Sequence, residues 1–171
     1  MFASALTLRG ETHYHSGDYY SASEDYTRVI EMEGAPVLQV AMAYVNRGSV
    51  HGSLGDQKAA IEHFTRVIEM KRIPVILVAK AYFNRSYSHG LLGDSQAAIA
   101  DLTQLIGLED APVDQVSEAY YRRGSIQAAM GRREEACHYL KSVRKISIQT
   151  GNDHVKRIVE HELERLGCEC E

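Results

Sequence analysis

Two stretches decide the fold of this chain: GDYYSASEDYTRVIEM, at Gly17–Met32, and GDQKAAIEHFTRVIEM, at Gly55–Met70. They are identical at ten of sixteen positions, and their first residues lie 38 positions apart. All three prolines of the chain follow the same step of 38, at Pro36, Pro74 and Pro112. Self-similarity at a fixed period of this length is typical of repeat proteins, so the sequence predicts a stack of similar units.

Each unit is predicted to form two antiparallel helices. Apolar residues recur every three to four positions in 36–54 and again in 60–68, which gives each helix one buried stripe. The prolines suit the first helical position, where the missing N–H costs nothing. A glycine at each step is expected to end the first helix, and the aspartate after it to cap the second. These residues are Gly17, Gly55, Gly93 and Gly131, followed by Asp18, Asp56 and Asp94.

The chain is predicted to be a single domain, 1–171, made of four repeats and a final helix. The repeats cover about 3–40, 41–78, 79–116 and 117–150, and the capping helix covers about 152–167. An amphipathic last helix would cover the apolar end that a stack of helical pairs leaves exposed. The N-terminal end has no such cap, so it is expected either to be a docking surface or to mark a piece of a longer chain.

The repeats resemble tetratricopeptide repeats. In the second unit, the conserved-type places of that family are filled by Tyr44, Gly48, His51, Ala60 and Phe64. The resemblance implies an all-α fold, a right-handed α-α superhelix of four helix pairs plus a C-terminal capping helix. The Asn46-Arg47-Gly48 motif is similar to that of many bacterial members, so a bacterial source is expected.

Two features depart from the family pattern. The repeat has 38 residues instead of 34, which adds about one helical turn and is expected to lengthen the start of the first helix. Arginine also stands where the family usually has leucine, and we expect it to be structural, with Asp25 and Asp101 as candidate partners. The arginines are Arg9, Arg47, Arg85 and Arg123.

Composition excludes several classes of protein. The hydrophobic and charged fractions, 44% and 25%, are those of an ordinary globular protein, and no apolar run is long enough to cross a membrane. A net charge of −4 argues against a nucleic-acid binder, which needs a basic surface. Three cysteines are too few for a disulfide framework and indicate a reducing compartment, so a cytoplasmic location is expected.

No catalytic or metal motif is recognisable, and neither an enzyme nor a cofactor is expected. His13, His51 and His89 are equivalent, but neighbouring helices lie about 10 Å apart and zinc–nitrogen bonds are about 2 Å, so these residues cannot share a metal ion. They are expected to pack in the core. Cys168-x-Cys170 is only a weak signal for a soft metal because no second Cys/His pair lies near it.

The resemblance places a peptide groove on the first helices of the pairs. The predicted groove residues are Asn46, Lys80, Phe83, Asn84, Tyr87, Tyr121 and Arg122. The aromatic residues suit anchoring contacts, the asparagines suit a peptide backbone, and the cations suit a carboxylate. The carboxylate clamp of chaperone-binding relatives does not fit, because Glu11 or Glu118 would oppose the incoming carboxylate.

The sequence therefore predicts a non-catalytic scaffold that binds a peptide or helix of another protein in the groove. The alternative is a structural module that self-associates as a homo-oligomer through its uncapped N-terminal end, around Phe2, Leu6 and Leu8.

Overall fold

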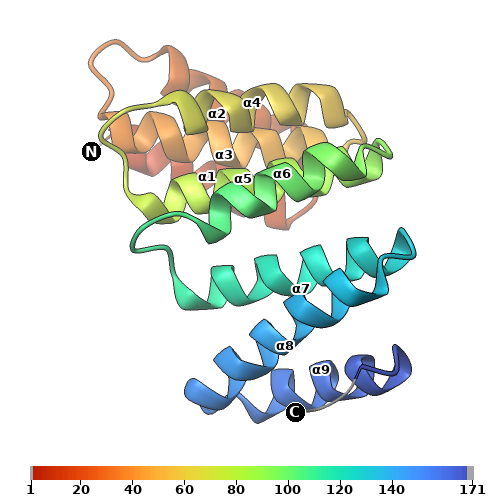
Figure 1. The fold of residues 1–171 in the computed structure, drawn as a ribbon. Helices are drawn as coiled ribbons and strands as arrows, with labels where there is room; N and C mark the ends of the chain where they lie inside the picture. The colour runs from red at the N-terminus through yellow and green to blue at the C-terminus, as the bar shows by residue number, and fades with distance from the viewer. Residues whose placement is uncertain (1, 169–171) are drawn as a thin grey trace. The chain divides into compact units, whose positions relative to one another are not determined.

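The computed structural model describes residues 2–168, and over that range every regular element is an α-helix (Figure 1). The helices are α1 (Phe2–His15), α2 (Tyr19–Glu31), α3 (Val37–Ser53), α4 (Gln57–Glu69), α5 (Val75–Leu91), α6 (Ser95–Ile106), α7 (Val113–Ala129), α8 (Arg133–Gln149) and α9 (Asp153–Arg165). They confirm the predicted fold class, an all-α helical repeat. None of these helices has both the length and the apolarity needed to cross a membrane.

The turns within the repeats form as the sequence predicts. Gly55 has a φ of 85°, in the left-handed region where a glycine is favoured, and the equivalent glycines share it. Asp56 then accepts a hydrogen bond from the Ala59 N–H at 3.1 Å, which caps α4. One detail differs: Pro36 is the N-cap residue of α3, one position before the predicted place, and its carbonyl accepts the first helical hydrogen bonds.

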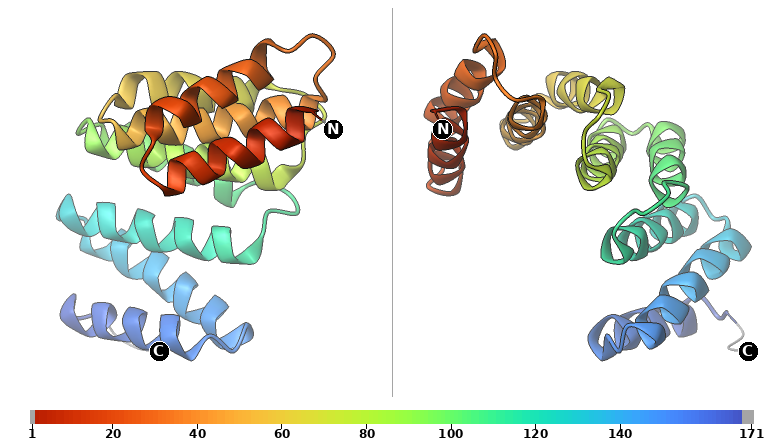
Figure 2. Two further views of the ribbon diagram at one scale, coloured as in Figure 1. Left: turned by 180° about the vertical axis from the view of Figure 1, so that it is seen from behind. Right: turned by 90° about the vertical axis from the view of Figure 1, so that its left-hand side faces the viewer.

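The chain divides after Ala98 into two compact units. In the first unit, α1, α3 and α5 lie side by side in one layer, and α2 and α4 form the other (Figure 2). The helices α3 and α5 have 17 residues each whereas α2 and α4 have 13, in agreement with a lengthened first helix.

Glycine in the first layer lets an aromatic ring of the second layer approach its backbone. A Cβ on Gly48 would lie 2.7 Å from Cε1 of Phe64, and one on Gly10 would lie 2.6 Å from Cε1 of Tyr26. Both rings are buried, with 2% and 1% of their residues' surface exposed. In the first and second repeats, an aromatic ring packed over a glycine therefore holds the two layers together.

In the first unit, the arginines at the family's leucine position contact the second layer. Arg9 forms two hydrogen bonds to the buried Asp25, as predicted. Arg47 instead donates to Thr27 Oγ1, in the preceding repeat, at 2.9 Å, and its guanidinium lies 5.6 Å from the centre of the Tyr44 ring. Arg85 repeats both contacts, with Thr65 and Tyr82. This series links successive repeats in the first unit.

In the second unit, α8 packs between α7 and α9. Val159 and Leu163 of α9 are buried against Leu140 and Val143 of α8. A disulfide joins Cys137 of α8 to Cys168, which follows α9. The sequence did not indicate this pairing: it offered Cys168 only as part of a weak signal for a soft metal. The positions of the cysteines in the sequence do not show that the turn after α9 lies next to α8. Cys170 lies outside the described residues.

Candidate functional site

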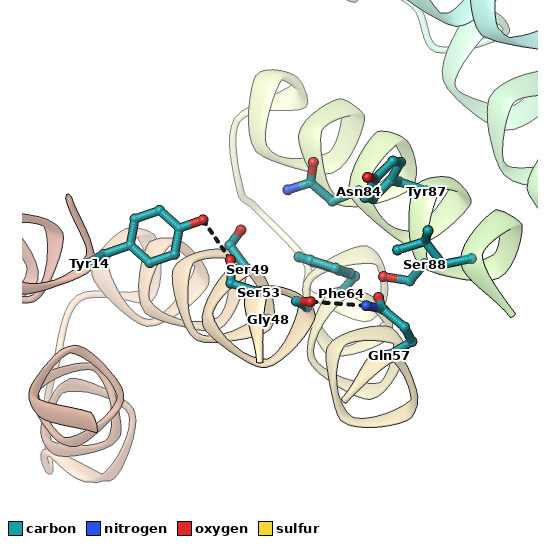
Figure 3. A pocket seen from close by; sticks show the side chains of 11 residues that line it. Tyr14, Gly48, Ser49, Ser53, Gln57, Phe64, Asn84, Tyr87 and Ser88 are labelled. Atoms are coloured by element: carbon teal, nitrogen blue, oxygen red, sulfur yellow. Dashed lines mark hydrogen bonds between the residues drawn. The ribbon is translucent and has the colours of Figure 1, made fainter. Parts of the chain in front are cut away.

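The layer of α1, α3 and α5 carries a cavity of about 310 Å³ (Figure 3). Tyr14 comes from α1, and Asn84 and Tyr87 come from α5 on the opposite side. Small residues of α3 lie between them, and the buried ring of Phe64 forms part of the floor. The full lining is Tyr14, Gly48, Ser49, Gly52, Ser53, Gln57, Phe64, Asn84, Tyr87, Ser88 and Leu91. Glycine and serine on α3 thus leave open space between two tyrosines.

Gln57, which lines this cavity, carries a buried acceptor without a hydrogen-bond partner among the described residues. It is the first residue of α4 and is only 9% exposed. Its Nε2 donates to the carbonyl of Gly52 at 3.0 Å, whereas its Oε1 is buried and has no hydrogen-bond partner within residues 2–168. An unpaired buried polar atom of this kind costs free energy, and it lies in the wall of the cavity.

A smaller cavity of about 180 Å³ lies beside the first, and Tyr14 and Ser49 line both. Its other lining residues are Glu11, His15, Tyr26, Asn46 and Lys80. Asn46 donates from Nδ2 to Glu11 Oε1 at 3.1 Å, which fixes the carboxylate at this edge. Burial, and after it the charge of Glu11, raises the pKa of the Tyr26 hydroxyl, so that this group keeps its proton.

The structure brings four predicted groove residues to this face. Asn46 and Lys80 line the smaller cavity, and Asn84 and Tyr87 line the larger one. Tyr87 is 49% exposed, so its ring is accessible. Phe83 is half-buried and lines neither cavity.

The other two predicted residues belong to the second unit. Tyr121 lines a separate cavity bounded by α7, α8 and α9. Arg122 is half-buried and lines none of these cavities.

Sequence reasoning missed Gln57 and Ser53. Ser53 shares a hydrogen bond of 3.0 Å with the Tyr14 hydroxyl and holds that ring at the edge of the cavity. The equivalents of Gln57 in the other repeats are Tyr19, Ser95 and Arg133, so no repeated pattern identifies it. A glutamine after a capping aspartate normally indicates an exposed helix start, and only the packed structure reveals its burial.

The chemistry of the larger cavity suits binding. Its side chains are aromatic, aliphatic, hydroxyl and amide groups, with no carboxylate, imidazole, amine or thiol to exchange protons near neutral pH. Within residues 2–168, no three or more His, Cys, Asp or Glu side chains form a group that could hold a metal ion. His13 and His51 lie beside the capping aspartates, with Nδ1 3.6 Å and 3.8 Å from a carboxylate oxygen.

Comparison with known proteins agrees with this architecture. Family models described as "Tetratricopeptide repeat" match residues 1–73, 79–112 and 118–146. Two crystal structures of MamA are similar, at 17% and 18% identity and TM-scores of 0.67 and 0.64. They cover 96% and 92% of this chain, which spans 90% and 91% of theirs.

The crystal structure of a tetratricopeptide repeat protein from Parabacteroides merdae is also similar, at 17% identity and a TM-score of 0.67. The match covers 98% of this chain and 68% of the Parabacteroides chain. These likenesses concern the fold. No curated protein sequence matches the chain.

Proposed function

The chain is a tetratricopeptide repeat protein, and from that premise we propose that it is a non-catalytic scaffold whose α1–α3–α5 face binds a segment of another protein. Repeats of this family are protein-interaction modules. The observation that carries the proposal is the cavity of about 310 Å³, which Tyr14 borders on one side and Asn84 and Tyr87 on the other.

The cavity offers both contact area and hydrogen bonds. The rings of Tyr14 and Tyr87, on opposite sides, are the kind of anchor that dominates protein interfaces. The Asn84 amide offers both a donor and an acceptor to the bound segment. Lys80, exposed at the smaller cavity, adds a positive charge next to Glu11. A bound chain would thus be held by apolar area and oriented by amide groups.

The proposal is tested by affinity capture on the immobilised protein. The double variant Asn84→Ala/Tyr87→Ala removes one side of the cavity, and Tyr20→Ala is the control. Tyr20 is 75% exposed and lies on α2, in the other layer. A protein retained by the wild type and by Tyr20→Ala, and lost from the double variant, supports the proposal. Equal retention by all three removes this face as the binding site.

A second candidate function is self-association through α1. Phe2 and Leu8 of this helix are 70% and 66% exposed, so two large apolar side chains of α1 are in contact with water. A homo-oligomer joined through α1 would bury both. Sedimentation velocity is the test: Phe2→Ser/Leu8→Ser should convert an oligomer into a monomer, and a wild type that is monomeric at high concentration rules this function out.

The cytoplasmic location and bacterial source remain predictions from the sequence. The Cys137–Cys168 disulfide weighs against a reducing compartment, because disulfides persist mainly in oxidising ones. Thiol alkylation of the protein taken directly from its native cells decides the point: two protected cysteines indicate an oxidising compartment, and complete alkylation indicates a reducing one.

A further inference from the structure

The second unit has a cavity of its own, of about 480 Å³. It lies within the range of roughly 300–1,000 Å³ typical of ligand pockets. Its walls come from α7, α8 and α9, whose order along the chain can be followed in Figure 1. The lining is Val113, Asp114, Ser117, Glu118, Tyr121, Val143, Ile146, Ser147, Thr150, Asn152, Val155, Ile158 and Val159.

Most of this lining is apolar, and part of it is open to water. Val143 and Val159 are buried and form the packed base, with 1% and 0% of their surface exposed. Ile158 and Val113, in contrast, are 41% and 55% exposed. Such a cavity favours an apolar side chain of a ligand. When that side chain enters, its own apolar surface and the exposed apolar surface of the cavity are both removed from water.

One wall of the cavity is acidic. Asp114 and Glu118 lie four residues apart on α7 and therefore on the same side of that helix. Both are exposed, neither forms an ion pair within residues 2–168, and no lysine, arginine or histidine lines the cavity. Two carboxylates beside apolar surface attract a cationic segment and repel an anionic one.

We propose that this cavity binds a cationic amphipathic segment of a partner protein. A leucine, isoleucine or phenylalanine of the segment enters between α7 and α9. A lysine or arginine near it pairs with Asp114 or Glu118, which lie about 6 Å apart along the helix axis. The apolar side chain supplies most of the affinity, and the carboxylates select the charge. The site lies wholly in the second unit and does not depend on the function proposed for the first.

The test is a selection from a displayed library of random 12-residue peptides against the full-length protein. The charge variant is Asp114→Asn/Glu118→Gln. Its control, Glu134→Gln/Glu135→Gln, removes two carboxylates from the start of α8, outside this cavity. Circular dichroism verifies that each variant is folded.

The wild type should enrich peptides with an apolar residue and an excess of lysine and arginine. Two exposed ion pairs are modest interactions, so the affinity of such peptides should fall about fivefold in the charge variant. It should stay within about twofold in the control, and the cationic excess should disappear when the library is selected on the charge variant.

The proposal is overturned by no enrichment, by enrichment without cationic excess, or by an equal loss in the control variant. Peptides lost from Asn84→Ala/Tyr87→Ala but not from the charge variant would belong to the first-unit face, so the two proposals fail separately. Self-association that the charge variant abolishes would make a second copy of the chain the occupant and would also refute a cationic partner segment.

Discussion

At Gly48, the ring of Phe64 occupies the space that a side chain would need. A Cβ there would lie 2.7 Å from Cε1 of the ring, closer than real contacts allow. Gly48→Ala should therefore destabilise the protein by about 1–3 kcal/mol, despite the better helix propensity of alanine.

Gly90→Ala is the matched control, because nothing lies within 4 Å of the position of its Cβ and it is also helical. Its free energy of unfolding should stay unchanged or rise by up to about 1 kcal/mol. Urea denaturation of the two variants measures both effects. A Gly48→Ala protein as stable as Gly90→Ala would contradict the packing described for the repeat.

His63 makes stability depend on pH. Burial, followed by the nearby charges of Arg47 and His51, lowers the pKa of His63 to about 4. The unfolded chain binds this proton near pH 6.5, so the contribution to stability is complete above that pH and is lost as the pH falls towards 4. In the fourth repeat the same place holds Tyr139, whose ring centre lies 4.3 Å from the Arg123 guanidinium.

His63→Tyr should keep the fold, with Arg47 against the new ring, and should reduce the loss of stability between pH 6.5 and 4. Urea denaturation at several pH values in this window measures the free energy of unfolding for both proteins. If the difference between wild type and variant does not change with pH, His63 is not the responsible group.

At the scale of elements, α9 is held to α8 in two ways. Its buried residues pack against Leu140 and Val143, and the Cys137–Cys168 disulfide closes a sequence separation of 31 residues. On chain-entropy grounds, closing such a loop stabilises the folded state by roughly 3–4 kcal/mol. The disulfide therefore fixes the helix that forms one wall of the second-unit cavity.

Cys168→Ser should lower the melting temperature, and Cys137→Ser should lower it by the same amount. The double variant should be no less stable than either single one, because all three lack the same bond. A reductant should bring the wild type to the stability of the variants. Wild-type melting that is unaffected by reductant, under conditions that reduce the disulfide, would contradict this account.

Periodicity and capping residues are local properties, which is why the sequence predicts the helices and their turns well. Gly55, Asp56 and Pro36 act through their own backbone, so their positions determine where helices end and begin. Contacts between repeats are less predictable. Arg47 donates to Thr27 of the preceding repeat, whereas the sequence pointed only to Asp25 and Asp101 as partners of these arginines.

At the scale of the whole molecule, the sequence predicts which helices carry the cavities but not all of the residues that line them. Asn84 and Tyr87 follow from the position of the first helices in the repeat. Gln57 does not, because its burial depends on Gly52 and on the start of α4 meeting in space. The two units then present different surfaces: amide and aromatic groups on α1, α3 and α5, and an apolar cavity with carboxylates on α7.

The measurement that tests the central claim most directly is photo-crosslinking in the native cells. A benzophenone amino acid replaces Tyr87 at the first-unit cavity in one protein, and Tyr20 on α2 in another; their side chains are 49% and 75% exposed. The account predicts that irradiation joins a partner protein to position 87 and not to position 20. A partner captured at position 20 and absent from position 87 would contradict binding on the α1–α3–α5 face.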